Sequence, residues 1–182
     1  YVYLLSISAV GFALVLWAAT QIPSYPSVIK FALLVLLAAL AAQATTSITV
    51  GSNAGITYHV GSVVGVASVP TLGVSSYILL LAAYNFFMWL FKPRNAVTWK
   101  KSWAQLGFNV GMHAIAAALS GWSFLATRAL LGDNSWAGMI LPWPVAAIVL
   151  EELNLWMLIG ILRLQNGVQF SAFAMWREEI WA

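Results

Sequence analysis

The feature that most constrains this chain is an interval without charge. Residues 31 to 91 contain no Asp, Glu, Lys or Arg, a run of 61 positions. In all 182 residues there are eight Lys and Arg and five Asp and Glu, so 7% of the chain is charged and 62% is apolar. Soluble domains carry roughly 25% charged residues, because their surfaces face water. We therefore expect the helices of this protein to face lipid.

The hydrophobic stretches predict an all-α fold: a polytopic membrane helix bundle of about six transmembrane helices, formed by a single integral-membrane domain at residues 1–182. A helix that crosses the hydrocarbon core needs about 20 mainly apolar residues. The candidate spans are 2–19, 28–45, 56–69, 71–91, 103–131 and 136–164. The third has only 14 residues before Pro70, so a half-helix packed inside the bundle is the alternative there.

The segment 45–55 differs from the spans around it, because β-branched residues alternate with polar ones and turn formers follow. This pattern predicts a loop or a short extended piece. Lipid cannot form hydrogen bonds with the backbone groups of this segment, so we expect the segment at the membrane interface or inside the protein.

The basic residues predict the orientation. Lys92, Arg94, Lys100 and Lys101 form the basic cluster of the chain. With six alternating spans, this cluster lies on the same side as Arg163 and Arg177, and the positive-inside bias makes that side cytoplasmic. The C-terminus is then cytoplasmic. If the third span is a half-helix, the N-terminus moves to the opposite face and the C-terminal half of the topology is unchanged.

Sequence motifs argue against an enzyme. The chain has no Gly-rich phosphate loop, no H-E-x-x-H, no G-x-S-x-G and no cysteine. Its net charge of +3 comes from basic residues at the predicted membrane rims, where Lys and Arg meet lipid phosphates, so nucleic acid is not an expected partner.

Polar residues at membrane depth form a candidate polar seam. Glu151, Glu152 and Asn154 lie in the sixth span, and Asn109 and His113 lie one helical turn apart in the fifth. Each costs free energy in lipid unless it has a partner. We predict that Asn109, His113 and one of the two carboxylates line one seam, either as structural hydrogen bonds or as a proton, cation or ligand site.

The two histidines, His59 and His113, are also candidate ligands of a metal, a haem or a chlorophyll, since neutral imidazole is a common axial ligand. Neither has a second ligand residue at i+3 or i+4, and an interhelical hydrogen bond is the alternative that we favour. No particular cofactor is indicated.

Small residues predict close helix contacts. Gly61 and Gly65 form one GxxxG pattern, and Gly107 and Gly111 form another. Such stripes let helix backbones approach closely, either within the bundle or against a second copy or another membrane subunit. Most of the ten Trp residues lie near span ends, where interfacial anchoring explains them.

Several short motifs together resemble a known family. They are Thr46-Ser47-Ile48-Thr49-Val50, Leu72-Gly73, Trp103-x-x-x-x-Phe108-Asn109-x-Gly111, Leu131-Gly132, Glu152-x-Asn154 and Trp176-Arg177-Glu178-Glu179-x-Trp181. Their order resembles the multispan N-terminal membrane region found ahead of HD-GYP phosphodiesterase or GGDEF cyclase modules in bacterial signalling proteins, notably of green non-sulfur bacteria. The resemblance implies a sensory or anchoring input module in the bacterial inner (cytoplasmic) membrane.

Two other functions stay open. One is an accessory subunit packed on a larger membrane complex, respiratory or photosynthetic, which the size, the Trp-rich rims and the two GxxxG stripes favour. The other is the substrate-binding component of an energy-coupling-factor type transporter, to which the length and the loop before the third span bear a looser likeness.

Overall fold

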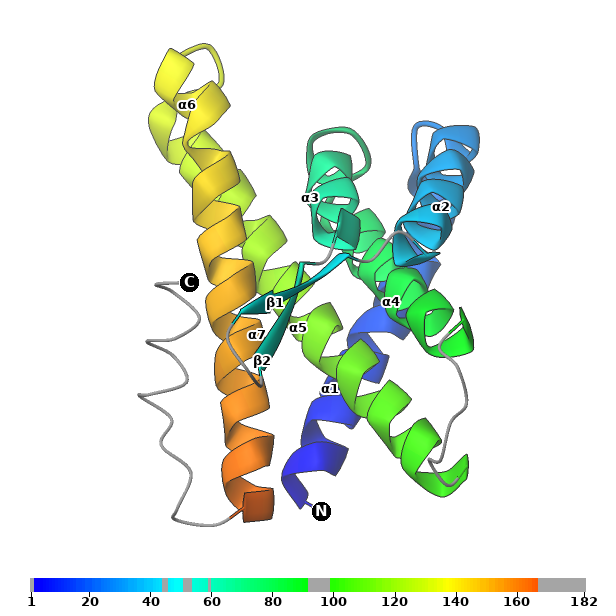
Figure 1. The fold of residues 1–182 in the computed structure, drawn as a ribbon. Coiled ribbons are helices and arrows are strands. Elements are labelled where there is room, and N and C mark those ends of the chain that lie inside the picture. Colours follow the sequence, from blue (N-terminus) through cyan, green and yellow to red (C-terminus); the bar gives the residue numbers. More distant parts are fainter. Residues whose placement is uncertain (1, 44–45, 51–53, 59, 92–98, 167–182) are drawn as a thin grey trace.

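The protein is a helical bundle in a computed structural model (Figure 1). The structure describes residues 2–43, 46–50, 54–58, 60–91 and 99–166, and it describes side-chain surroundings within 2–41, 63–90 and 103–164. In chain order the elements are α1 (Val2–Thr20), η1 (Ile22–Ser24), α2 (Val28–Gln43), β1 (Thr46–Val50), β2 (Ala54–Tyr58), α3 (Val60–Leu72), α4 (Val74–Phe91), α5 (Trp99–Leu131), α6 (Trp136–Ile140) and α7 (Pro142–Asn166).

Helix α5 is the central element of the bundle. It has 33 residues, is about 50 Å long by the helical rise, and packs against α1, α4 and α7. Helix α4 in turn packs against α2 and α3. The main core therefore gathers apolar residues of α1, α3, α4, α5 and α7, and a smaller cluster lies between α2 and α4.

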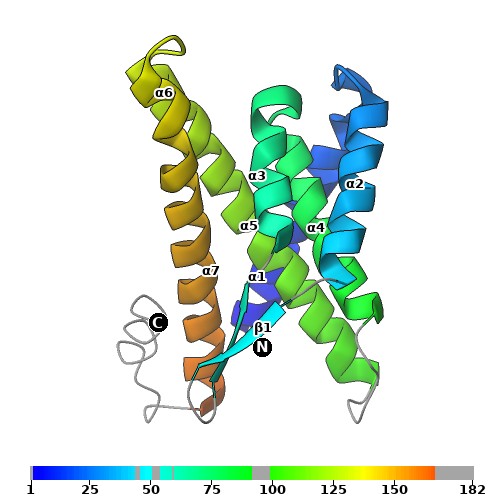
Figure 2. The same ribbon diagram turned by 45° about the horizontal axis from the view of Figure 1, so that its top comes forward.

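The bundle has two ends (Figure 2). The beginning of α1, the beginning of α5 and the end of α7 lie at one end, and η1, the α3–α4 junction and α6 lie at the other. We call the first the N-terminal end and the second the α6 end.

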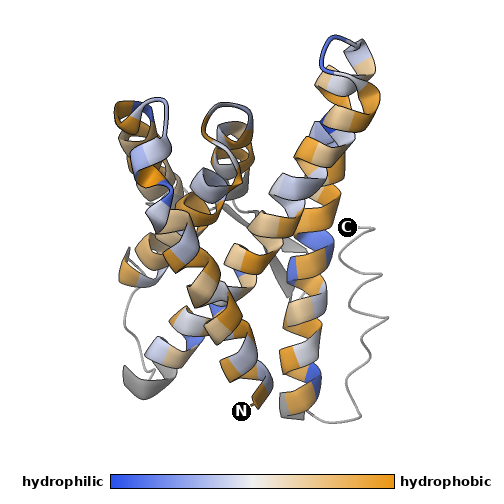
Figure 3. Cartoon of the chain, turned by 180° about the vertical axis from the view of Figure 1, so that it is seen from behind, coloured by the Kyte–Doolittle hydropathy of each residue, from blue (hydrophilic) through white to orange (hydrophobic). Residues whose placement is uncertain are grey.

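Within the residues that the structure describes, three helical segments are long and apolar enough to cross a membrane: Val2–Ser24, Trp103–Leu131 and Trp136–Leu164. Val28–Ala41, Val63–Leu72 and Val74–Leu90 are shorter apolar helices. Figure 3 shows hydrophobic colour along all of these helices, interrupted by a hydrophilic patch halfway along α7.

The third predicted span begins later than its sequence suggests. Residues 56–58 belong to β2, which pairs antiparallel with β1 in the register Ser47 with Thr57 and Ile48 with Ile56. β-Branched side chains favour this extended pairing. The helix that follows, α3, has 13 residues, or about 20 Å, so it is a half-helix by length. The N-terminus nevertheless lies at the same end of the bundle as the end of α7, so the expectation that a half-helix moves it to the opposite end is wrong.

Two boundaries depend on Gly and Pro. Pro70 lies inside α3, which continues to Leu72 and ends at Gly73, whose φ of 85° is one that L side chains rarely adopt.

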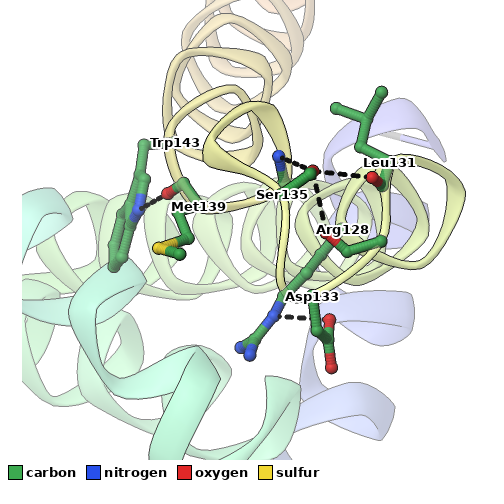
Figure 4. Close-up of polar contacts among 8 residues, drawn as sticks. Arg128, Leu131, Asp133, Ser135, Met139 and Trp143 are labelled. Carbon is green, nitrogen blue, oxygen red and sulfur yellow. Dashed lines mark hydrogen bonds and ion pairs between the residues drawn. The ribbon is translucent and has the colours of Figure 1, made fainter.

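The predicted sixth span is broken at Leu141, because Pro142 brings no N–H and begins a new helix. Ser135 caps the short α6 by accepting a hydrogen bond from the Gly138 N–H at 2.9 Å (Figure 4).

Candidate functional site

The predicted seam residues of α5 are joined through the backbone. His113 is buried, with 7% of its surface exposed, and its Nδ1 lies 2.8 Å from the carbonyl oxygen of Asn109. A carbonyl oxygen only accepts, so this hydrogen bond places a proton on Nδ1. In the neutral ring Nε2 is then an acceptor. Asn109 contributes to this contact through its main chain rather than its amide.

The three polar residues of α7 have different surroundings. Glu151 is exposed on the bundle surface, and Glu152 is half-buried and accepts a hydrogen bond from the indole Nε1 of Trp156 at 3.1 Å. The Oδ1 atom of Asn154 is buried, and within the described part of the chain it has no hydrogen-bond partner. One turn of α7 therefore carries two carboxylates and a buried amide oxygen.

The two halves of the seam lie on packed neighbours, since α5 and α7 contact each other along the bundle. The specific pairing of His113 with Glu151 or Glu152 stays a prediction.

A second polar junction joins three helices and was missed by the sequence reasoning. Ser120 of α5 donates a hydrogen bond to the carbonyl oxygen of Ala146 in α7 at 2.7 Å. The Tyr77 hydroxyl of α4 is hydrogen-bonded to the same serine, and Glu151 lies within electrostatic range of Tyr77. Tyr77 is 1% exposed and Ser120 is fully buried. The seam carboxylate Glu151 is thus connected electrostatically with a junction of α4, α5 and α7.

A sequence signal for this junction exists at Ser120. It follows the small-residue stripe of α5 and comes seven residues after His113, which places both on one side of the helix. Tyr77 offers only a lone phenol in an apolar helix, and nothing in its local sequence predicts its partner.

The glycines of α5 have two different roles. A Cβ added at Gly111 would lie 2.6 Å from the Ile7 carbonyl oxygen and 2.9 Å from the Ser8 Cα of α1. Gly11 of α1 faces Gly111 at the same crossing. A Cβ at Gly107 would meet only the Ser8 Oγ, at 3.7 Å, which is ordinary contact. The backbones of α1 and α5 therefore touch at Gly111 and not at Gly107.

The other GxxxG pattern lies in α3. A Cβ at Gly65 would run into the ring of Tyr77, so this glycine lets α3 approach α4 at the polar junction. Gly61 belongs to the first turns of α3, but its surroundings lie outside the described side chains, and His59 lies outside the described residues altogether. Gly11 was missed by the sequence reasoning, although it is the only glycine of α1.

Within the described ranges, no three His, Cys, Asp or Glu residues are grouped so that they could hold a metal ion. The facing helices α5 and α7 instead carry an imidazole, two carboxylates, a serine hydroxyl and the Asn154 amide oxygen, groups that can exchange hydrogen bonds or a proton. No protein family, curated protein or solved structure matches the chain.

Proposed function

We propose that the chain is a non-catalytic integral-membrane domain of the bacterial cytoplasmic membrane, and that it acts as the sensory or anchoring input module of a signalling protein. The observation that carries the membrane assignment is the outward face of the helices. Large apolar side chains are exposed along α1 and α2, among them Leu5, Phe12, Leu33 and Leu36, and no charged residue lies on α1. Soluble monomers rarely expose apolar patches above a few hundred Å².

The distribution of charge along the bundle axis supports the same assignment. Lys100 and Lys101 lie in the first turn of α5 and Arg163 in the last turns of α7, all at the N-terminal end of the bundle. Lys30 and Arg128 lie at the α6 end. The positive-inside bias then makes the N-terminal end cytoplasmic. Helix α7 ends on that side, where an output module would act.

The polar groups of α5 and α7 are the part of this domain that we assign to sensing. His113, the carboxylates of α7 and the Tyr77–Ser120 junction lie inside or beside helices whose remaining faces are apolar. Intramembrane ionisable groups are costly and often mark ion or ligand sites. A change of protonation or occupancy there would alter how α4, α5 and α7 pack.

A pair of topology reporters tests the proposal. A green fluorescent protein fused after Ala182 should fluoresce, and alkaline phosphatase at the same place should be inactive, because both report a cytoplasmic position. The matched control is an insertion of each reporter in the turn between α5 and α6, where the two readouts should be reversed. An active phosphatase after Ala182 would contradict the orientation and the proposed output side.

The accessory-subunit alternative is favoured by one observation on α7. Glu151 is exposed near the middle of this helix, and Ile148, three residues earlier on the same side, is exposed too. An exposed carboxylate is costly at the bilayer centre, so a protein neighbour on this face would stabilise it. A photo-crosslinking amino acid at Ile148 should then capture a defined membrane subunit, whereas the same label at Leu36 on α2 should capture none. Lipid adducts alone at both positions would remove this alternative.

A further inference from the structure

Helices α5 and α7 diverge toward the N-terminal end of the bundle, and the beginning of α1 lies between them (Figures 1 and 2). Helix α1 packs extensively against α5, but within the described residues it has no comparable packing against α7. Contacts between the beginning of α1 and the end of α7 are therefore few, and each can be identified.

Tyr3 of α1 connects these two helices. Its hydroxyl donates a hydrogen bond to the main-chain carbonyl oxygen of Met157 in α7, at 3.0 Å. A carbonyl oxygen has two lone pairs, so it can accept this bond in addition to a bond within its own helix. The hydrogen bond therefore depends on the backbone of α7 at Met157 and not on the methionine side chain.

Gly160 makes room for the Tyr3 phenol. It lies three residues after Met157, so the two positions are neighbours on the surface of α7. A Cβ at Gly160 would lie 2.6 Å from the Tyr3 hydroxyl oxygen and 2.9 Å from Tyr3 Cζ, closer than real Cβ atoms approach. The Tyr3 ring also lies beside the Phe108 ring of α5, with centroids 6.5 Å apart. Tyr3 thus reaches both of the diverging helices.

We call the hydrogen bond to Met157 and the fit against Gly160 the Tyr3 contact. Helices α1 and α7 each pack separately against α5, so this contact can open while the bundle stays folded. From Gly160 to the end of α7 at Asn166 the helical rise is about 9 Å. The Tyr3 contact therefore acts on the last two turns of α7.

We propose that the Tyr3 contact is a releasable connection that holds the last turns of α7 against the beginning of α1. In the closed state the phenol fills the space at Gly160. In the open state the end of α7 moves away from α1, while both helices keep their packing against α5. The movement would reach an output module through the end of α7, and this last step rests on the proposed function.

Distances between spin labels, measured by double electron–electron resonance on the full chain in lipid nanodiscs, test the proposal. The chain has no cysteine, so Leu5→Cys with Leu164→Cys, both at exposed positions, reports the separation of α1 and α7. The control pair is Leu130→Cys with Ile148→Cys, also at exposed positions, in the half of the bundle where Ser120 joins α5 to α7. The unaltered Tyr3 contact should give mainly the short α1–α7 distance.

Tyr3→Phe removes only the hydroxyl and should raise the ratio of long to short α1–α7 distances about threefold, as the loss of one interhelical hydrogen bond implies. Gly160→Ala places a methyl group against the phenol and should raise the ratio at least about fivefold, although alanine favours the helix itself. Met157→Leu is the matched control. It keeps the accepting carbonyl and should leave the ratio unchanged.

An unchanged α1–α7 distance in either Tyr3→Phe or Gly160→Ala would overturn the proposal, and so would an equal shift of the control pair, which would indicate general loosening. If Gly160→Ala does not fold by circular dichroism, Tyr3→Phe decides alone. The topology reporters after Ala182 separate this result from the proposed function. Release of the Tyr3 contact with a non-cytoplasmic C-terminus contradicts only the output side, and unchanged distances with a cytoplasmic C-terminus contradict only the Tyr3 contact.

Discussion

Helices α2 and α5 are both largely apolar, but the surroundings of their apolar side chains differ. Helix α2 buries Ala38 and Ala41 against Leu80 and Tyr84 of α4 and exposes large apolar side chains on its other face. Helix α5 buries a row of alanines, together with His113 and Ser120, and packs mainly against α1, α4 and α7. The outer face of α2 therefore contacts whatever surrounds the bundle, whereas most side chains of α5 contact other helices of the bundle.

This difference indicates which helix contacts stabilise the assembled bundle. In the proposed membrane location, lipid provides the same apolar contact to α2 whether or not the helices are associated, so the outer residues of α2 add little to folding. At α5, close backbone contact and hydrogen bonds exist only in the assembled bundle. Substitutions on α5 should therefore change stability more than substitutions on the outer face of α2.

The largest effect is expected at Gly111. Gly111→Ala places a methyl group against the Ile7 carbonyl and Ser8 Cα of α1, and overpacking typically costs about 1–3 kcal/mol. Gly107→Ala is the matched control, since its Cβ has room and alanine favours the helix by about 1 kcal/mol. Titration with SDS, followed by circular dichroism, measures both. Equal stability of the two variants would mean that α1 and α5 do not touch at Gly111.

An intermediate effect is expected at the polar junction. Ser120→Ala removes the bond to the Ala146 carbonyl and the partner of Tyr77, and interhelical hydrogen bonds in membrane bundles contribute about 0.6 kcal/mol, up to about 1.7. A double-mutant cycle with Tyr77→Phe should show non-additive losses of unfolding free energy. The control is Ser123→Ala, because Ser123 donates to Leu119 of its own helix at 2.8 Å. Additivity of Ser120→Ala and Tyr77→Phe would show that the junction is not formed.

The smallest effect is expected on α2. Leu36 is exposed at the middle of this helix, so Leu36→Ala should change the free energy of unfolding by less than about 0.5 kcal/mol, the usual range for substitutions away from packed sites. The same SDS titration measures it. A loss above about 2 kcal/mol, typical of a buried leucine, would place another protein surface on this face and weaken the contrast with α5.

Much of the helical framework could be predicted from the sequence, because long apolar runs and their Gly and Pro boundaries are local signals. The runs 2–19 and 103–131 coincide closely with α1 and α5. The break at Leu141 was missed, although Pro142 and Pro144 mark it, because hydrophobicity alone is continuous there. The hairpin was expected only as a loop or extended piece, since its pairing depends on a second strand that begins in the predicted loop and continues through residues 56–58 of the predicted third span.

The candidate site was less predictable, because tertiary contacts decide it. Gly107 and Gly111 are equivalent in a GxxxG pattern, and only the position of α1 distinguishes them. The partner of His113 within its own helix follows from i, i+4 geometry. The partners of Ser120 lie 26 residues away on α7 and on α4, which no local pattern indicates. The C-terminal motif at 176–181 lies outside the described residues.

Spin-label accessibility in reconstituted bilayers tests the central claim, that lipid is the solvent of the outer helix faces. The chain has no cysteine, so Leu36→Cys, Ile148→Cys and Ser24→Cys can each be labelled singly. We predict that the labels at Leu36 and Ile148 collide more often with molecular oxygen than with a water-soluble nickel complex, and that Ser24 at the α6 end shows the reverse. Nickel accessibility at Leu36 as high as at Ser24 would place that face in water and contradict the membrane assignment.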